Sequence, residues 1–187
     1  MNKVSLLALL LLGSYFPPLI ADDSTIVFMR SSMGGAMIKT SIYEVTGGET
    51  KFIGILKNKT KIKYKTAPGK RTFMVVSEAA DFMEAEITAG KTYYSVITPR
   101  MGAWKARFSM VPVRNDGTTD FNTESKKFKK ILNKSKLAAL TEKSKKWYQK
   151  NKDSVESKKT KYWAKWQEKS AEEIASRTLN PDDGVPN

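Results

Sequence analysis

Apolar and polar residues alternate along most of the first 115 residues. A clear case is the run AWKARFSMVPV (103–113), where tryptophan, alanine, phenylalanine and methionine alternate with lysine, arginine and serine. Successive side chains of a strand point to opposite faces, so the first set predicts a core face that includes Trp104, and the second a solvent face. Turn residues separate eight such runs, at 24–30, 37–45, 51–56, 61–66, 71–76, 82–87, 91–98 and 103–113. The pattern predicts an antiparallel β-sandwich or a small barrel.

The pattern changes after Asn115-Asp116-Gly117. Between residues 123 and 177 there is no proline or glycine, and apolar side chains recur every three or four residues. This spacing places them on one face of a helix, and it predicts two or three helices with breaks near Ser135 and at 151–153. Five aromatic side chains on these faces are predicted to dock the helices on the sandwich: Trp147, Tyr148, Tyr162, Trp163 and Trp166.

The chain therefore divides into four predicted segments within an α+β fold. Residues 1–21 form a signal peptide, 22–115 a β-sandwich of about eight short strands, and 116–178 a lysine-rich helical extension. Residues 179–187 contain two prolines and a glycine, and they are predicted to be a flexible tail.

The N-terminus has the pattern of an export signal. Lys3 precedes a leucine-rich run at 4–12, and Ala21 is a small residue followed by two aspartates. This order is typical of a signal peptide, and it predicts cleavage after Ala21 and a periplasmic or secreted mature protein. An uncleaved membrane anchor is the alternative, although two prolines interrupt the segment. No later segment is apolar enough to be expected to cross a membrane.

Composition narrows the possible chemistry. The chain carries a formal net charge of +14 and contains no cysteine and no histidine. Disulfides and Cys/His metal sites are therefore excluded, and so is the usual general base near neutral pH. No nucleophile motif or phosphate-binding glycine loop is present. We therefore expect no enzymatic activity, no metal and no cofactor.

Residues 68–113 carry three recognisable motifs: Pro68-Gly69-Lys70, the run AGKTYY at 89–94, and Gly102 before Trp104. With them the segment resembles a family of exported bacterial β-sandwich domains of unknown function. The resemblance implies a sandwich and a location in the cell envelope, and it implies no reaction. This chain departs from lipoprotein members because it has no cysteine to acylate.

A row of alternating lysines marks the fourth predicted strand. In KNKTKIKYKT (57–66) the first two lysines are expected in a turn, which leaves Lys61, Lys63 and Lys65 on one face of the strand. This face is either a solvated, edge-protecting surface, with a possible cross-strand pairing to Glu84 or Glu86, or an anion-binding surface.

The helical extension is also strongly basic. Residues 124–165 contain 15 lysines and four acidic residues. Lys158, Lys161 and Lys165 share one arc of the last long helix, beside a separate arc of aromatic residues. Such a helix either lies on anionic lipid or docks on the sandwich with its lysines in water.

Two functions follow from these patterns. The first is a non-enzymatic cell-envelope protein whose lysines bind an anionic polymer, a lipid headgroup or an acidic protein. The second is a structural or accessory subunit of an envelope complex, docked through apolar helix faces and merely solubilised by its lysines. Nucleic acid is a disfavoured partner, because no reader motif is present and the export signal directs the chain elsewhere.

Overall fold

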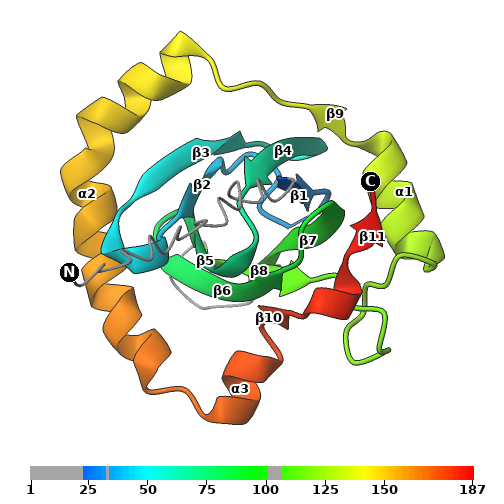
Figure 1. The fold of residues 1–187 in the computed structure, drawn as a ribbon. Coiled ribbons are helices and arrows are strands. Elements are labelled where there is room, and N and C mark those ends of the chain that lie inside the picture. Colours follow the sequence, from blue (N-terminus) through cyan, green and yellow to red (C-terminus); the bar gives the residue numbers. More distant parts are fainter. Residues whose placement is uncertain (1–22, 33, 101–106) are drawn as a thin grey trace, which may run out of the picture.

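The computed structural model describes residues 23–32, 34–100 and 107–187 and is a β-sandwich with helices on its outer faces (Figure 1). The predicted α+β class is confirmed. The predicted signal peptide with its cleavage site after Ala21 lies outside the described residues, and so do Gly102 and Trp104. Within the described residues no helix is long and apolar enough to span a membrane.

The first sheet is built from β1, β4, β7 and β8, which span Ser24–Arg30, Thr60–Thr66, Lys91–Arg100 and Arg107–Pro112. The second is built from β2, β3, β5 and β6, which span Thr40–Glu44, Lys51–Leu56, Gly69–Val76 and Ala80–Ile87. Each strand coincides with one of the eight alternating runs. The runs do not predict direction, however, and β1 lies parallel to β7 while the other pairings among these eight strands are antiparallel.

The core lies between the two sheets and follows the period-two pattern. Ile26 and Phe28 point inward from β1, and Phe73 and Val75 point inward from β5. The rings of Phe28 and Phe73 meet edge to face with centroids 5.3 Å apart. Burying such side chains supplies most of the stabilisation of a sandwich of this size.

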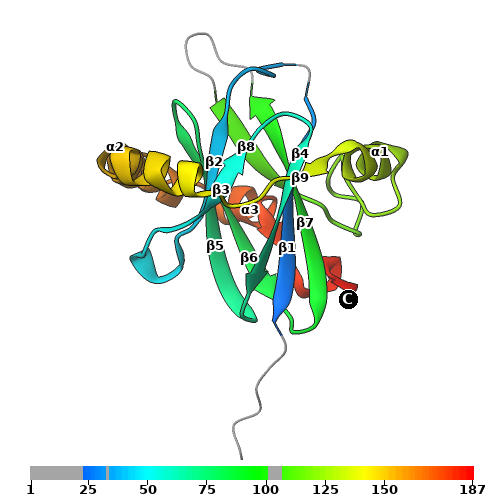
Figure 2. The same ribbon diagram turned by 90° about the horizontal axis from the view of Figure 1, so that it is seen from above.

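Residues 113–187, which we call the belt, run once around the sandwich (Figure 1). The belt contains α1, β9, α2, α3, β10, the 3-10 helix η2 and β11, which span Lys126–Lys134, Lys136–Leu137, Glu142–Gln167, Ala171–Ala175, Thr178–Leu179, Pro181–Asp183 and Val185–Pro186. Helix α1 packs through Phe128 and Ile131 on the outer face of the first sheet. Helix α2 covers the outer face of the second sheet, so the two helices lie on opposite sides of the sandwich (Figure 2).

Helix α2 is longer than its sequence pattern predicts. Thr141 caps its first turn in a reciprocal capping box with Ser144, and the helix then continues through 151–153, where a break was predicted. Asn151 does not start a new helix, because its side-chain amide donates to the Trp147 carbonyl one turn earlier. The next N-cap is Ser170, which begins α3.

The last nine residues are not a free tail. Strand β10 pairs with β6, β11 pairs with the start of β7, and Leu179 is fully buried in the core. Proline and glycine are unfavourable inside a helix, but they suit a short edge strand. Gly184 is required at its position, because a Cβ there would lie 2.5 Å from the Tyr93 ring. The predicted flexible tail is therefore wrong.

Hydrogen bonds between the first and last segments of the belt hold it closed around the sandwich. The Arg114 guanidinium donates to the Ala175 carbonyl at 2.9 Å. The buried Asp183 carboxylate accepts the main-chain N–H groups of Asn115 at 3.1 Å and Asn180 at 2.7 Å. This closure joins the end of β8 to the C-terminal turn.

We expect Asp183 to make stability depend on pH. Burial raises the pKa of its carboxyl, although the two main-chain donors act in the opposite direction. A raised pKa means that the folded chain binds the proton more tightly than the unfolded chain. The free energy of unfolding therefore falls as pH rises from 3.8 through the raised pKa. In thermal melts at a series of pH values, the stability of Asp183→Asn should fall less over this pH range than that of the unchanged protein, because the variant has no carboxyl group at this position to titrate. An identical fall in both proteins would contradict the role of Asp183.

Candidate anion-binding site

The three lysines of β4 lie on the outer face of the first sheet, as their alternation predicts, but they differ in environment. Lys61 is half-buried, and its ammonium donates to the Leu132 carbonyl of α1 at 2.8 Å. It thus binds the negative end of that helix. Lys63 and Lys65 are exposed beside it.

The cross-strand neighbours of these lysines are not acidic. Lys63 lies opposite Val27, and Lys65 lies opposite Thr25. The suggested partners Glu84 and Glu86 are in the second sheet, opposite Thr72 and Lys70 of β5. The predicted pairing is therefore wrong, because strand alternation does not specify which strands become neighbours.

The three predicted anion-binding lysines of α2 also separate into two kinds. Lys158 is half-buried and donates to the Ser77 carbonyl at the end of β5, at 2.7 Å. Its neighbour Lys159 donates to the Gly48 carbonyl at 2.6 Å, so both tether α2 to the sandwich. Lys161 and Lys165 are exposed.

The aromatic side chains of α2 face the second sheet. Tyr148 and Trp166 are buried there, and Tyr162 and Trp163 are half-buried against the same cluster. The Tyr148 ring stacks on Phe52 with centroids 4.8 Å apart. Trp147 differs from the others, because 39% of its surface is exposed.

From α1 to the end of α2, exposed lysines far outnumber exposed acidic residues on the belt. Every lysine between residues 124 and 165 is exposed except Lys158 and Lys159. Three of the four acidic residues in this range are already paired, in the ion pairs Glu124–Lys129, Glu142–Lys145 and Glu156–Lys159. Most of the remaining lysine charge therefore faces solvent.

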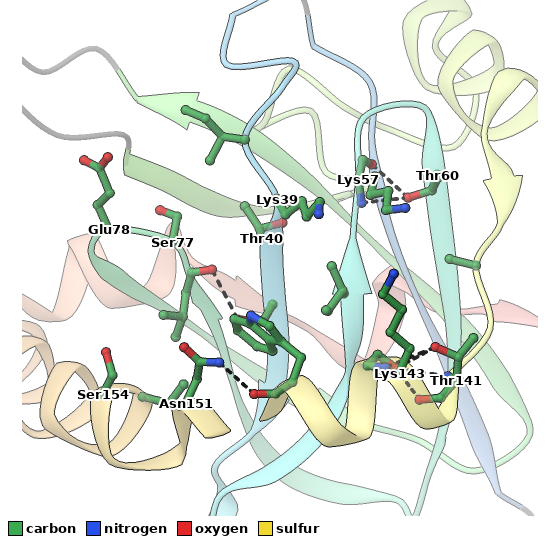
Figure 3. A pocket seen from close by; sticks show the side chains of 18 of the residues that line it. Lys39, Thr40, Lys57, Thr60, Ser77, Glu78, Thr141, Lys143, Asn151 and Ser154 are labelled. Atoms are coloured by element: carbon green, nitrogen blue, oxygen red, sulfur yellow. Dashed lines mark hydrogen bonds between the residues drawn. The ribbon is translucent and has the colours of Figure 1, made fainter. Parts of the chain in front are cut away.

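A cleft of about 630 Å³ lies between α2 and the part of the second sheet formed by the start of β2 and the ends of β3 and β5 (Figure 3). Val76, Ser41 and Ile55 come from adjacent positions on β5, β2 and β3 and form its floor, so the cleft crosses the strands. Trp147 and Val155 line it from α2. The sequence did not predict this cleft, because its lining comes from segments far apart along the chain.

Three lysines gather at one end of the cleft. Thr40 at the start of β2 is paired with Leu56 at the end of β3. Lys39 and Lys57 are the next residues beyond this pair, so they lie at the same edge of the second sheet. Lys143 reaches the same end from the first turn of α2, whereas Glu78 lies at the other end (Figure 3). None of the three lysines has an ion-pair partner among the residues described.

The loop that carries Lys39 is held by a buried arginine. The Arg30 guanidinium donates to the main-chain carbonyls of Gly35 and Ile38 and lies over the Phe108 ring, 4.2 Å from its centroid. Burial lowers the pKa of Arg30, yet its intrinsic pKa is so high that it remains charged. The main chain just before Lys39 is therefore anchored to β1 at Gly35 and Ile38.

In the described part of the chain, no group of three or more acidic side chains is placed to hold a metal ion. Neither a family model, nor a curated protein, nor a solved structure matches the chain. The interpretation of these surfaces therefore depends on their geometry and charge.

Proposed function

We propose that this protein is a non-enzymatic, exported protein of the bacterial cell envelope that binds an anionic polymer. The binding surface consists of the exposed lysines of the belt together with Lys63 and Lys65. The observation that carries the proposal is the orientation of the belt, whose aromatic side faces the sandwich while its lysine side faces solvent. Lysine suits such binding, because its mobile point charge accepts many anion geometries.

The belt geometry favours a polymer over a membrane. The lysines lie along the belt from α1 to the end of α2, and these two helices are on opposite sides of the sandwich, so a flat bilayer would meet only part of them, whereas a flexible chain can wrap around (Figure 2). An interfacial helix would also need its aromatic face in the lipid. Trp166 is only 3% exposed, so that face of α2 is already covered.

The alternative of a structural subunit docked through apolar helix faces receives less support. The apolar faces of α1 and α2 already pack on the sheets. Among the described residues the exposed large apolar side chains are Met37, Leu137, Leu140 and Trp147. They form no long helical stripe.

Two matched lysine variants test the proposal. One carries Lys146→Gln, Lys161→Gln and Lys165→Gln on the outward side of α2, and the other carries Lys51→Gln, Lys59→Gln and Lys70→Gln on sandwich turns and edges. All six side chains are exposed, so both variants should fold. With soluble polyglutamate at low salt, the α2 variant should bind about tenfold more weakly and with a shallower salt dependence, because fewer counterions are released.

The control variant has the same net charge and should keep its affinity within about twofold. Equal losses in both variants would show that only net charge matters and would contradict a belt surface. If the protein sediments with phosphatidylglycerol vesicles but binds neither polyglutamate nor polyphosphate, its anionic partner is a membrane and the proposal is wrong.

A further inference from the structure

We infer that the cleft between α2 and the second sheet binds an amphiphile with one anionic group and one acyl chain. This site shares only Lys143 with the exposed lysines of the belt, and it can be correct whether or not the belt binds a polymer. Its volume of about 630 Å³ lies within the range typical of small-ligand sites, about 300–1,000 Å³.

The lysine end of the cleft defines where the anionic group lies. Lys39, Lys57 and Lys143 bring three positive charges together from three different elements. The backbone around them is fixed, because Thr40 donates to the Leu56 carbonyl and Lys57 exchanges hydrogen bonds with Thr60. A carboxylate or phosphate here would form charge-assisted hydrogen bonds with these lysines.

The middle of the cleft is suited to an apolar chain. Ile55, Val76, Val155 and Trp147 line it, and two of these side chains, Ile55 and Trp147, have exposed surface. An acyl chain would remove this apolar surface from water, which is favourable in proportion to the area covered.

The polar side chains along the cleft are largely engaged within the protein. Ser41 donates to the Val76 carbonyl, Asn151 to the Trp147 carbonyl, and Ser144 to the Thr141 carbonyl. A peptide in this cleft would bury its own N–H and C=O groups with few partners, at a cost for each group. A hydrocarbon chain has no such groups, so an amphiphile fits better than an acidic peptide.

Calorimetric titration of the full chain below the critical micelle concentration tests the inference with four probes. Palmitate and palmitoyl lysophosphatidate share the chain and differ in the anionic group. Palmitoyl lysophosphatidylcholine keeps the chain but is zwitterionic, and inorganic phosphate lacks the chain. We expect binding of one molecule of palmitate, lysophosphatidate or both, at least tenfold weaker binding of the zwitterionic lipid, and no binding of phosphate.

Two variants locate the site. Lys57→Gln with Lys143→Gln should weaken anionic amphiphile binding at least tenfold, and Ala139→Trp should weaken it by filling the cleft. Lys161→Gln with Lys165→Gln removes the same charge outside the cleft and should leave amphiphile binding unchanged. All these positions are exposed, and equal urea midpoints would show that each variant is folded.

The titrations also identify the source of the ligand. Binding of palmitate alone would identify the ligand as a free fatty acid. Binding of lysophosphatidate alone would identify it as a lipid with a phosphate headgroup. Either result supports the site. Equal affinity for the zwitterionic lipid, a stoichiometry well above one, or equal losses in the two double-lysine variants would overturn it. Polyglutamate binding by Ala139→Trp, which leaves every lysine in place, separates this result from the belt proposal.

Discussion

Replacement of Trp166 by alanine should lower the free energy of unfolding by about 3–5 kcal/mol, the range measured for deletion of a buried aromatic side chain. Trp166 is 3% exposed and lies at the far end of α2, where its ring centroid is 5.9 Å from that of Phe82 in β6. Its removal leaves a cavity beneath the last turns of the helix. Urea unfolding monitored by circular dichroism would measure the change.

Two tryptophan variants serve as controls. Trp147→Ala removes the same side chain from the same helix at a position that is 39% exposed, and it should cost much less. Trp166→Phe keeps most of the ring and removes an indole N–H that has no hydrogen-bond partner among the described residues, so its cost should also be small. If Trp166→Ala and Trp147→Ala unfolded at the same urea concentration, α2 would not be anchored by its aromatic face.

Replacement of Asp81 by alanine should lower the free energy of unfolding by about 2–4 kcal/mol, because it leaves two partly buried arginines without their carboxylate. Asp81 is buried in β6, with its oxygens 3.3 Å from Arg177 and 3.4 Å from Arg100. Arg177 also donates to the Met110 carbonyl in β8. This cluster therefore joins three strands of the sandwich to the belt just before β10.

A surface ion pair provides the matched control. Asp120 lies 3.6 Å from Lys127, but its side chain is 83% exposed, so Asp120→Ala should change the free energy of unfolding by less than about 1 kcal/mol. Asp81→Asn keeps the shape of the side chain and should fall between the two alanine variants. Equal denaturation midpoints for Asp81→Ala and Asp120→Ala would show that the arginine cluster does not hold the belt.

Lysine serves two purposes in this chain. Lys61, Lys158 and Lys159 each donate to a main-chain carbonyl of another element and help to hold α1 and α2 in place. Lys63, Lys65, Lys161 and Lys165 remain exposed and available to a partner. The high net charge therefore overstates the number of lysines that can bind an anion, and substitutions should be chosen by exposure.

Local periodicity determined much of this fold. The alternating runs predict all eight principal strands, because a sandwich strand must place every second side chain in the core. The helical stripe likewise predicts that Tyr148 and Trp166 share an apolar face, and the alternation of Lys61, Lys63 and Lys65 predicts their common face. These features depend only on the neighbours of each residue along the chain.

Only the tertiary structure decided how these elements meet. The parallel pairing of β1 with β7, the entry of β10 and β11 into the two sheets, and the separation of Glu84 from Lys63 all depend on which elements become neighbours. The cleft depends on the same choice, since Lys39, Lys57 and Lys143 come together only after α2 crosses the second sheet. Side-chain periodicity encodes which face of an element is apolar, whereas its partner is selected by long-range packing and by main-chain hydrogen bonds, which leave little trace in the order of residues.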